Sequence, residues 1–303
     1  MALNTPYDAE HVAATAIKLL GPDLNIASTF NRYFESDFGG GVGFHVNVRK
    51  PITLAGRKRA LDDQTAITVD NISQTVVPVA LTDHAYSAVT VSDEDLTLKL
   101  MDFSKQVLMP QVNAVSRTIE KTCVDVLEAT TASSTIHFGV DYAGALTAFT
   151  AARKALRQMG VPNQGLVAAL GTNVYEALLN SGALRNLYAS GLQGVLVEGQ
   201  IQTLSGFSVI ESNELNPDDG FFYHGDAFTL AVVAPQVPSG VPFGVSMSDS
   251  GFALRYIRDY DPSTLADRSV VSTFVGAKAM SVDSIHLDGT RTSQVPCVKV
   301  TTV

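Results

Sequence analysis

Cysteine and charge are both scarce in this chain of 303 residues. Its two cysteines, Cys123 and Cys297, lie far apart and form no CxxC or CxxH spacing, which excludes a zinc ribbon and fits synthesis in a reducing cytoplasm. Charged residues make up 17% of the chain and apolar residues 46%. This balance is typical of a folded protein that also has surfaces to cover, for instance through contacts between subunits.

Long apolar runs are absent as well. No run of about 18 apolar residues occurs, and no basic leader precedes a short apolar block at the N-terminus, so we expect neither export nor a membrane span. The net charge of −9 argues against a protein that binds nucleic acid through a dense basic surface. The charge is uneven, however: residues 49 to 63 carry +3, which leaves −12 for the remainder.

The sequence also lacks the common motifs of catalysis and metal binding. GxSxG, HExxH and GxxxxGK[ST] do not occur, and the acidic segments NPDDG and DYDP are more typical of turns than of cation sites. Cys123 falls on the apolar stripe of a predicted helix, which argues against a nucleophile. We therefore predict no metal, no cofactor and no catalytic residue. The histidines stand singly: His11, His45, His84, His137, His224 and His286.

The most unusual stretch is GGGVGFHVNVRKP, at residues 39 to 51. A phosphate cradle needs glycines followed by the N-terminus of a helix, but here apolar side chains alternate from 42 to 48, which predicts a strand. We interpret the glycines as a hinge rather than a phosphate site. Strand-like runs follow at 66 to 73 and 75 to 91, where Pro78 indicates an edge or a bulge. A long hairpin of this kind cannot bury its own apolar side chains, so something else must cover it.

A basic cluster lies within this extended region. It allows three interpretations: a patch that faces DNA, the tip of an arm that rests on an acidic partner, or a solvated loop. Its members are Arg49, Lys50, Arg57, Lys58 and Arg59.

Helical periodicity marks three longer elements. Residues 8 to 20 form an amphipathic pattern that ends at Gly21-Pro22. Ser92 and Asp95 form a capping box, and Pro110 restarts a helix that runs to residue 130, about 30 Å long. Its predicted buried stripe is Val112, Val115, Ile119, Cys123 and Val126.

The second half of the chain alternates helices and strands. A helix is predicted at 141 to 160, capped by Asp141 and closed by Gly160, and a shorter helix in TNVYEALLNSG. Strands are predicted in GLVAALG, GFSVIES, FTLAVVAP, FALRYIRDY and SVVSTFVGAKAM, so this half is an α/β body.

The order of these parts resembles the major capsid proteins of tailed bacteriophages with the HK97-like fold, in the branch of podovirus-type coat proteins. The resemblance spans nearly the whole chain. It is carried by VNVRKP at 46 to 51, VSDEDLTLKLMDFSKQVLMP at 91 to 110, ARKALRQMGVP at 152 to 162 and GFALRYIRDYDPSTLADRSVVSTFVGAKAM at 251 to 280.

This resemblance implies an α+β fold with an N-terminal arm, an extended β-hairpin loop, a long spine helix and an α/β axial domain. The DYDPSTLADR segment would form the loop at the local threefold axis. The implied boundaries are 1 to 38 for the arm, 39 to 91 for the β-loop, 92 to 140 for the peripheral domain, 141 to 250 for the axial domain, 251 to 275 for the returning peripheral strands, and 276 to 303 for an axial strand and C-terminal tail.

The implied function is structural. Subunits of this family form pentamers and hexamers that close an icosahedral shell around double-stranded DNA without sequence-specific binding, in the host cytoplasm and then in the virion. The chain lacks the room for an inserted β-domain or a scaffold-like extension, so a separate scaffolding protein is implied beside the portal, and a decoration protein is a further partner that the family allows. For the covalent Lys–Asn cross-linking known in part of the family, the chain has no identifiable residue set, although Lys58 is a conceivable donor.

The basic cluster then acquires a specific role. Residues 92 to 102 carry −3, and we expect Arg57, Lys58 or Arg59 of one subunit to pair with acids of the next. The acids are Asp93, Glu94, Asp95 and Asp102. Two alternatives remain open at this point: an encapsulin-type compartment with the same fold, and an uncharacterised hydrolase or carbohydrate-binding protein.

Overall fold

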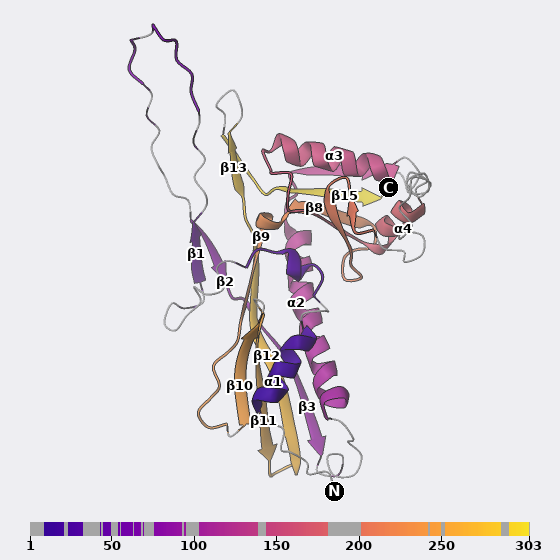
Figure 1. The fold of residues 1–303 in the computed structure, drawn as a ribbon. Coiled ribbons are helices and arrows are strands. Elements are labelled where there is room, and N and C mark those ends of the chain that lie inside the picture. Colours follow the sequence, from indigo (N-terminus) through magenta and orange to yellow (C-terminus); the bar gives the residue numbers. More distant parts are fainter. Residues whose placement is uncertain are drawn as a thin grey trace. The chain divides into compact units, whose positions relative to one another are not determined.

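The structure is a computed structural model. It describes residues 9–20, 24–32, 43, 45–49, 54, 56–62, 64–67, 69, 76–92, 94, 103–138, 144–180, 201–241, 243–249, 252–285 and 291–302. The chain divides into two compact units (Figure 1). The first unit comprises Met1–Val46, Val79–Val126 and Thr229–Lys278, and the second comprises Asn47–Pro78, Leu127–Phe228 and Ala279–Val303.

An antiparallel sheet forms the base of the first unit. Its strands lie in the order β10-β11-β12-β3, and β9 pairs with another part of β12. The strands β11 and β12 are consecutive in the chain and form a hairpin that closes where Asp261 pairs with Ala266. The bounds are β3 (Asp83–Ser92), β9 (Phe228–Val233), β10 (Phe243–Asp249), β11 (Phe252–Asp261) and β12 (Ala266–Ala279).

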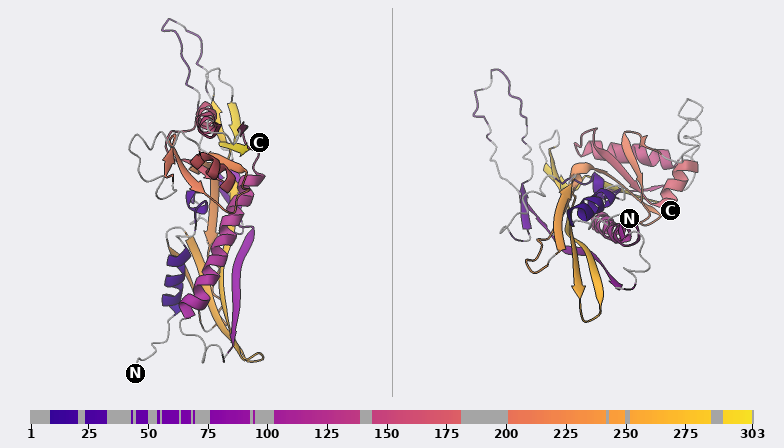
Figure 2. Two further views of the ribbon diagram at one scale, coloured as in Figure 1. Left: turned by 90° about the vertical axis from the view of Figure 1, so that its right-hand side faces the viewer. Right: turned by 60° about the horizontal axis from the view of Figure 1, so that its bottom comes forward.

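Two helices cover one face of this sheet. Helix α1 (Ala9–Leu20) packs against β10 and β11, and helix α2 (Met109–Ala129) runs along the same side, as the views in Figure 2 show. Gln111 at the start of α2 donates to the carbonyl oxygens of Ser87 and Ser269 and accepts from the Ser269 hydroxyl. This buried amide is therefore satisfied at both ends and ties α2 to β3 and β12.

The long helix largely follows the predicted pattern. Val112, Val115, Ile119 and Cys123 are fully buried, as predicted, but Val126 is only half-buried and Leu127 takes its place. The reason is the helical period of 3.6 residues, which brings position 127 rather than 126 under 123. A π-helical turn (Ser104–Leu108) leads directly into α2, so the helix does not restart at Pro110. The wider turn accommodates a proline that has no N–H to donate.

A buried carboxylate holds the segment that follows α1. Glu120, on α2, is 7% exposed and accepts hydrogen bonds from the backbone N–H groups of Ile26 and Ala27. These groups stand at the start of the short 3-10 helix Ala27–Thr29, where N–H donors lack helical partners. Farther along, the Arg32 guanidinium lies 4.1 Å from the centre of the Phe252 ring on β11. The Leu230 N–H on β9 also donates to the Asn31 carbonyl oxygen, so the segment from residue 24 to 32 contacts α2, β9 and β11.

A mixed sheet of six strands forms the second unit, in the order β4-β15-β8-β5-β7-β6. β4 and β15 are parallel, as are β5 and β7, and the remaining pairs are antiparallel. The last strand of the chain is therefore paired on both edges. The bounds are β4 (Ser134–Phe138), β5 (Leu166–Leu170), β6 (Thr203–Leu204), β7 (Phe207–Glu211), β8 (Asp219–His224) and β15 (Cys297–Thr302).

Helices α3 (Gly144–Gln158) and α4 (Thr172–Asn180) bury their apolar sides against this sheet. Three rings form the centre of the core: Phe149 from α3 packs edge-on against Phe222 and Phe207, with centroid distances of 4.7 and 6.0 Å. Phe207 and Phe222 also meet edge-on at 5.1 Å. Helix α3 ends at Gln158, and Gly160, two residues beyond, has a φ of +81° that suits glycine, which places the stop close to the predicted one. The predicted cap, Asp141, lies outside the described residues.

Two small hairpin sheets complete the described strands. β1 (His45–Arg49) pairs with β2 (Val76–Ala80), and β13 (Val282–Ile285) pairs with β14 (Arg291–Gln294). Strand β1 follows the glycine-rich stretch, as predicted, and Gly43 has a φ of +86°, a backbone conformation that favours glycine. Pro78 lies in β2, a strand of a two-stranded sheet, which agrees with the predicted edge position.

Some strand predictions were wrong or missing. Residues 66, 67 and 69, within the strand predicted at 66 to 73, lie in no strand; the other residues of that run are outside the described part. Alternation alone does not make a strand where no partner is paired with it. The strands β4, β6, β8 and β10 were not predicted, and for residues 276 to 303, where β13, β14 and β15 lie, the resemblance implied one axial strand without giving its bounds. Both acidic segments border turns, which agrees with the prediction: Asp218 N–H donates to the Asn216 side chain, and Ser263 N–H donates to Asp261. Asp219 already belongs to β8, and Asp261 is the last residue of β11.

Both cysteines are fully buried. Burial raises the pKa of the Cys297 thiol to about 12, and burial together with the nearby Glu120 carboxylate raises the pKa of Cys123 well above its usual range. The thiols therefore stay protonated near neutral pH. Within the described ranges, no helix has the length and hydropathy needed to cross a bilayer.

Alkylation should reflect this protection. At pH 8 we expect iodoacetamide to leave Cys123 and Cys297 unlabelled in the folded protein and to label both in denaturant, because the thiolate is the reacting form and folding suppresses it. Mass spectrometry of the labelled peptides measures the outcome. Prompt labelling of either cysteine in the folded protein would contradict the packing described above.

A second test concerns the close approach of β12 to the chain near Ala80. A methyl group on Gly276 would lie 2.0 Å from the Ala80 carbonyl oxygen and 2.9 Å from Leu81 Cα. We expect Gly276→Ala to lower the free energy of unfolding by about 2 kcal/mol or more, measured by urea denaturation. Gly240→Ala is the matched control, since nothing lies within 4 Å of its added methyl. Equal stability of the two variants would refute the predicted clash.

Candidate assembly surfaces

The segment between β1 and β2 carries large apolar side chains that are exposed to solvent. Its described residues, at 54, 56–62, 64–67 and 69, form neither helix nor strand and are drawn toward the far end of the loop in Figure 1. Leu54 is 56% exposed, Ile67 72% and Val69 77%, and Leu61 is completely exposed. We call this segment, residues 54 to 69, the arm; it is distinct from the N-terminal arm predicted at residues 1 to 38. Four large apolar side chains in so short a segment favour a surface that another molecule covers.

The basic cluster sits on the same arm. Arg57, Lys58 and Arg59 are all exposed. The Arg59 guanidinium donates to the Thr65 carbonyl oxygen at 2.9 Å, a contact that links the two sides of the arm. Arg49 is the last residue of β1, but its side chain and all of Lys50 lie outside the described residues.

The acidic partners proposed from the sequence are only partly described. Glu94 is exposed, two residues beyond the end of β3, whereas Asp93, Asp95 and Asp102 lie outside the described residues. Arg57 to Arg59 belong to the second compact unit and Glu94 to the first. The hypothesis pairs residues of different copies, so a single chain does not test it.

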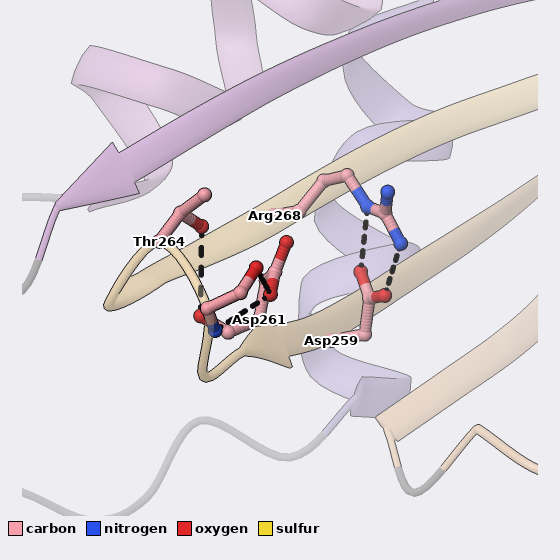
Figure 3. A network of polar contacts seen from close by, with 5 residues as sticks. Asp259, Asp261, Thr264 and Arg268 are labelled. Atoms are coloured by element: carbon pink, nitrogen blue, oxygen red, sulfur yellow. Dashed lines mark hydrogen bonds and ion pairs between the residues drawn. The ribbon is translucent and has the colours of Figure 1, made fainter.

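Another exposed feature is the closed end of the β11–β12 hairpin. Asp259 on β11 stands directly opposite Arg268 on β12, and the carboxylate accepts from both Nε, at 3.0 Å, and Nη2 of the guanidinium (Figure 3). On the other face of the hairpin, Arg258 donates from Nε and Nη2 to Asp267. Side chains of consecutive residues in a strand point to opposite faces, so the two ion pairs brace the hairpin from both sides.

The turn beyond these pairs has its own polar contacts. The Asp261 carboxylate accepts from the Ser263 N–H and hydroxyl groups, and Thr264 N–H donates to the Asp261 carbonyl oxygen. These hydrogen bonds from Ser263 are the main reason that the pKa of Asp261 is lowered. The hydrogen bond and the charge of Asp259 raise the pKa of Arg268. The end of the hairpin is therefore a well-defined turn, with charged side chains that bind one another.

Two apolar side chains project from this turn region. Leu265 is 62% exposed and has a φ of +49°, and Tyr260 is 48% exposed. The sequence predicted a loop at DYDPSTLADR but no contact residue in it. One weak sequence signal pointed to the exposure of Leu265: it is a large apolar residue within a run of turn-forming residues. The ion pairs depend on strand register, and no sequence signal predicted them.

Comparison with known proteins supports one family. The family model described as "Phage capsid protein" matches residues 58–273. A solved structure of Mycobacterium phage Che8 is 20% identical, covers 91% of this chain and 90% of its own, and superposes with a TM-score of 0.64. The capsid of the cyanophage P-SCSP1u is 13% identical, with coverages of 86% and 84% and a TM-score of 0.58. No curated protein matches the chain.

The fold is also found in a virus-like particle from Pyrococcus furiosus, which is 11% identical over 96% of this chain and 98% of its own, with a TM-score of 0.54. At such identities the structural likeness speaks for the fold alone, and it confirms the predicted α+β, HK97-like architecture. The family assignment comes from the sequence model, and the encapsulin alternative is not favoured. Because that model matches well over half of the chain, this protein belongs to the phage capsid protein family and is a major capsid protein of the virion shell.

Proposed function

We propose that copies of this chain assemble into pentamers and hexamers that close an icosahedral shell around double-stranded DNA, and that the arm of each copy rests on its neighbour. The single observation that carries the arm contact is the exposure of Leu54, Leu61, Ile67 and Val69. Burying one such side chain on a neighbour contributes about 1.5–3 kcal/mol. A ring of identical copies offers each arm the same acceptor, as a head-to-tail interface requires.

We assign the register of the arm contact to charged side chains. The arm carries Arg57, Lys58 and Arg59 on an otherwise acidic chain, and residues 92 to 102 carry −3. Opposite charges across an interface steer the partners and fix their register more than they add affinity. We therefore assign the apolar residues to the strength of the contact and the ionic pairs, including Glu94, to its register.

The roles that we propose for the segments of the chain follow the family pattern. Residues 1 to 38 act as the N-terminal arm, 39 to 91 as the β-loop, 92 to 140 and 251 to 275 as the peripheral domain, 141 to 250 as the axial domain, and 276 to 303 as an axial strand and tail. The turn after β11 meets other copies at a local threefold axis. The role of the chain is structural rather than enzymatic.

Other partners follow from the same role. A separate scaffolding protein, a portal and a decoration protein would act with this chain during assembly in the cytoplasm of the bacterial host. The net charge of −9 suits a container for DNA, because strong phosphate contacts would trap the packaged molecule. Contact with DNA would be without sequence specificity.

Reversal of two arm charges tests the ionic part of the contact. We expect Arg57→Glu with Lys58→Glu to reduce the yield of closed particles about tenfold while the subunit stays folded, because both side chains are exposed. Electron microscopy counts the particles, and circular dichroism with thermal unfolding monitors the fold. Adding Glu94→Lys to the double variant should restore part of the yield.

Lys121→Glu with Lys154→Glu is the matched control, since it makes the same charge change at exposed sites on α2 and α3. If the arm variant forms normal shells at the concentration of the unaltered protein, the ionic pairing is wrong. Equal loss in the control would also reject a specific role for the arm charges.

A further inference from the structure

Three polar side chains lie on the buried side of α2. Gln111, Ser116 and Glu120 are 1%, 1% and 7% exposed. Gln111 exchanges hydrogen bonds with Ser269, and Glu120 accepts from two backbone N–H groups. The Ser116 hydroxyl has no hydrogen-bond partner, and within the described part of the chain no other buried side-chain polar atom lacks one. Burial of an unpaired hydroxyl destabilises a fold, so this residue needs an explanation.

The helix itself offers an acceptor that Ser116 does not use. Thr118 and Thr122 donate from their hydroxyl groups to carbonyl oxygens four residues earlier in α2, at 2.9 Å each. A serine can form the same bond, and the equivalent acceptor for Ser116 is the Val112 carbonyl oxygen. The Ser116 hydroxyl lacks even this bond, so its need for a partner is not met within its own helix.

Glu120 lies one helical turn beyond Ser116 on the same side of α2. Residues four apart in a helix have Cβ atoms about 5–6 Å apart, and helical side chains lean toward the N-terminus, so that of Glu120 extends over the turn that carries Ser116. The two side chains form no direct hydrogen bond. A single water molecule with two hydrogen bonds of about 2.8 Å spans such a separation.

The Glu120 carboxylate has acceptor positions for a water molecule. Its two oxygens accept from the Ile26 and Ala27 N–H groups, at 3.2 and 3.4 Å. A carboxylate has about four lone-pair sites, so these two bonds do not exhaust it. The N–H donors already direct positive partial charge at the group, which disfavours a cation beside them and favours a neutral ligand.

We propose that Ser116 and Glu120 hold a buried water molecule, which accepts from the Ser116 hydroxyl and donates to the Glu120 carboxylate. Globular proteins commonly satisfy buried polar groups in this way. Ser116 is then a positioning residue: the water orients Glu120, and Glu120 holds residues 26 and 27 against α2. This inference concerns the folded subunit and does not rest on the proposed assembly.

Substitution by alanine gives opposite results with and without the water. Removal of a hydroxyl that has no partner relieves its desolvation cost and stabilises the fold, whereas removal of the water's partner leaves the buried carboxylate poorly solvated. We expect Ser116→Ala to raise the unfolding equilibrium constant about fivefold, measured by urea denaturation of the dispersed subunit. An unchanged or lower constant would overturn the proposal.

Thr118→Ala is the matched control. It also removes a hydroxyl from α2 and also gains helix propensity, but its side chain is exposed and bonds within its own helix. We expect its unfolding constant to stay within about twofold of that of the unaltered protein. A loss as large as that of Ser116→Ala would trace the effect to the helix rather than to the water and reject the inference.

Amide exchange locates the effect. In Ser116→Ala we expect peptides covering residues 24 to 32 to exchange about tenfold faster, because Glu120 is less firmly held, while peptides from the rest of the first unit keep their rates. A loss of packing alone would instead speed exchange throughout that unit. Either that uniform change or unaltered exchange at residues 24 to 32 would contradict the proposed role of Ser116.

A double substitution tests whether the two residues act together. Glu120→Gln keeps the shape of the side chain but removes its charge, so Ser116→Ala should raise the unfolding constant by a smaller factor in that background. Factors that simply multiply would show that the residues act independently and that no water joins them.

A high-resolution density map shows the water directly. A peak within hydrogen-bond distance of Ser116 Oγ and the Glu120 carboxylate, absent from the map of Ser116→Ala, supports the proposal. A Ser116 hydroxyl bonded to the Val112 carbonyl oxygen would refute it. These measurements need no closed shell, so failure of this inference is distinguishable from failure of the proposed function.

Discussion

The apolar side chains of the arm impose the constraint on which the account depends. Ile67 and Val69 are 72% and 77% exposed, and their segment has no regular secondary structure in its described residues. The hydrophobic effect favours removing such surface from water, and a segment without a sheet partner cannot do so alone. In the proposed function a second copy of the chain supplies the cover, so that assembly becomes a consequence of how the chain folds.

The compact units supply rigid supports for that assembly. In the first unit, Gln111 and Glu120 join α2 to the sheet and to the segment after α1 through buried hydrogen bonds. In the second, the aromatic contact of Phe149, Phe207 and Phe222 packs α3 against the sheet. Each unit therefore has its own core.

Local patterns in the sequence predicted the elements that depend on local contacts. Helices α1 and α2, the buried strand β5 and the turn at Asp261 were all predicted closely, because periodicity and turn residues lie within one segment. The position of strand β15 within residues 276 to 303 was not predicted from the residue pattern, since these six residues become a central strand only by pairing with β4 and β8. The pair of Asp259 and Arg268 likewise depends on register. Of the candidate contact residues, exposure of Arg57, Lys58 and Arg59 could be predicted, whereas the acidic partners proposed for them belong to other copies and are not tested by a single chain.

Hydrogen–deuterium exchange of the arm, in dispersed subunits and in assembled particles, tests the central claim most directly. Exchange reports whether backbone amides are protected by hydrogen bonds and burial. The account predicts fast exchange of peptides covering residues 54 to 69 in the dispersed subunit and marked slowing after assembly. Equally fast exchange in both states, or full protection already in the solitary subunit, would contradict it.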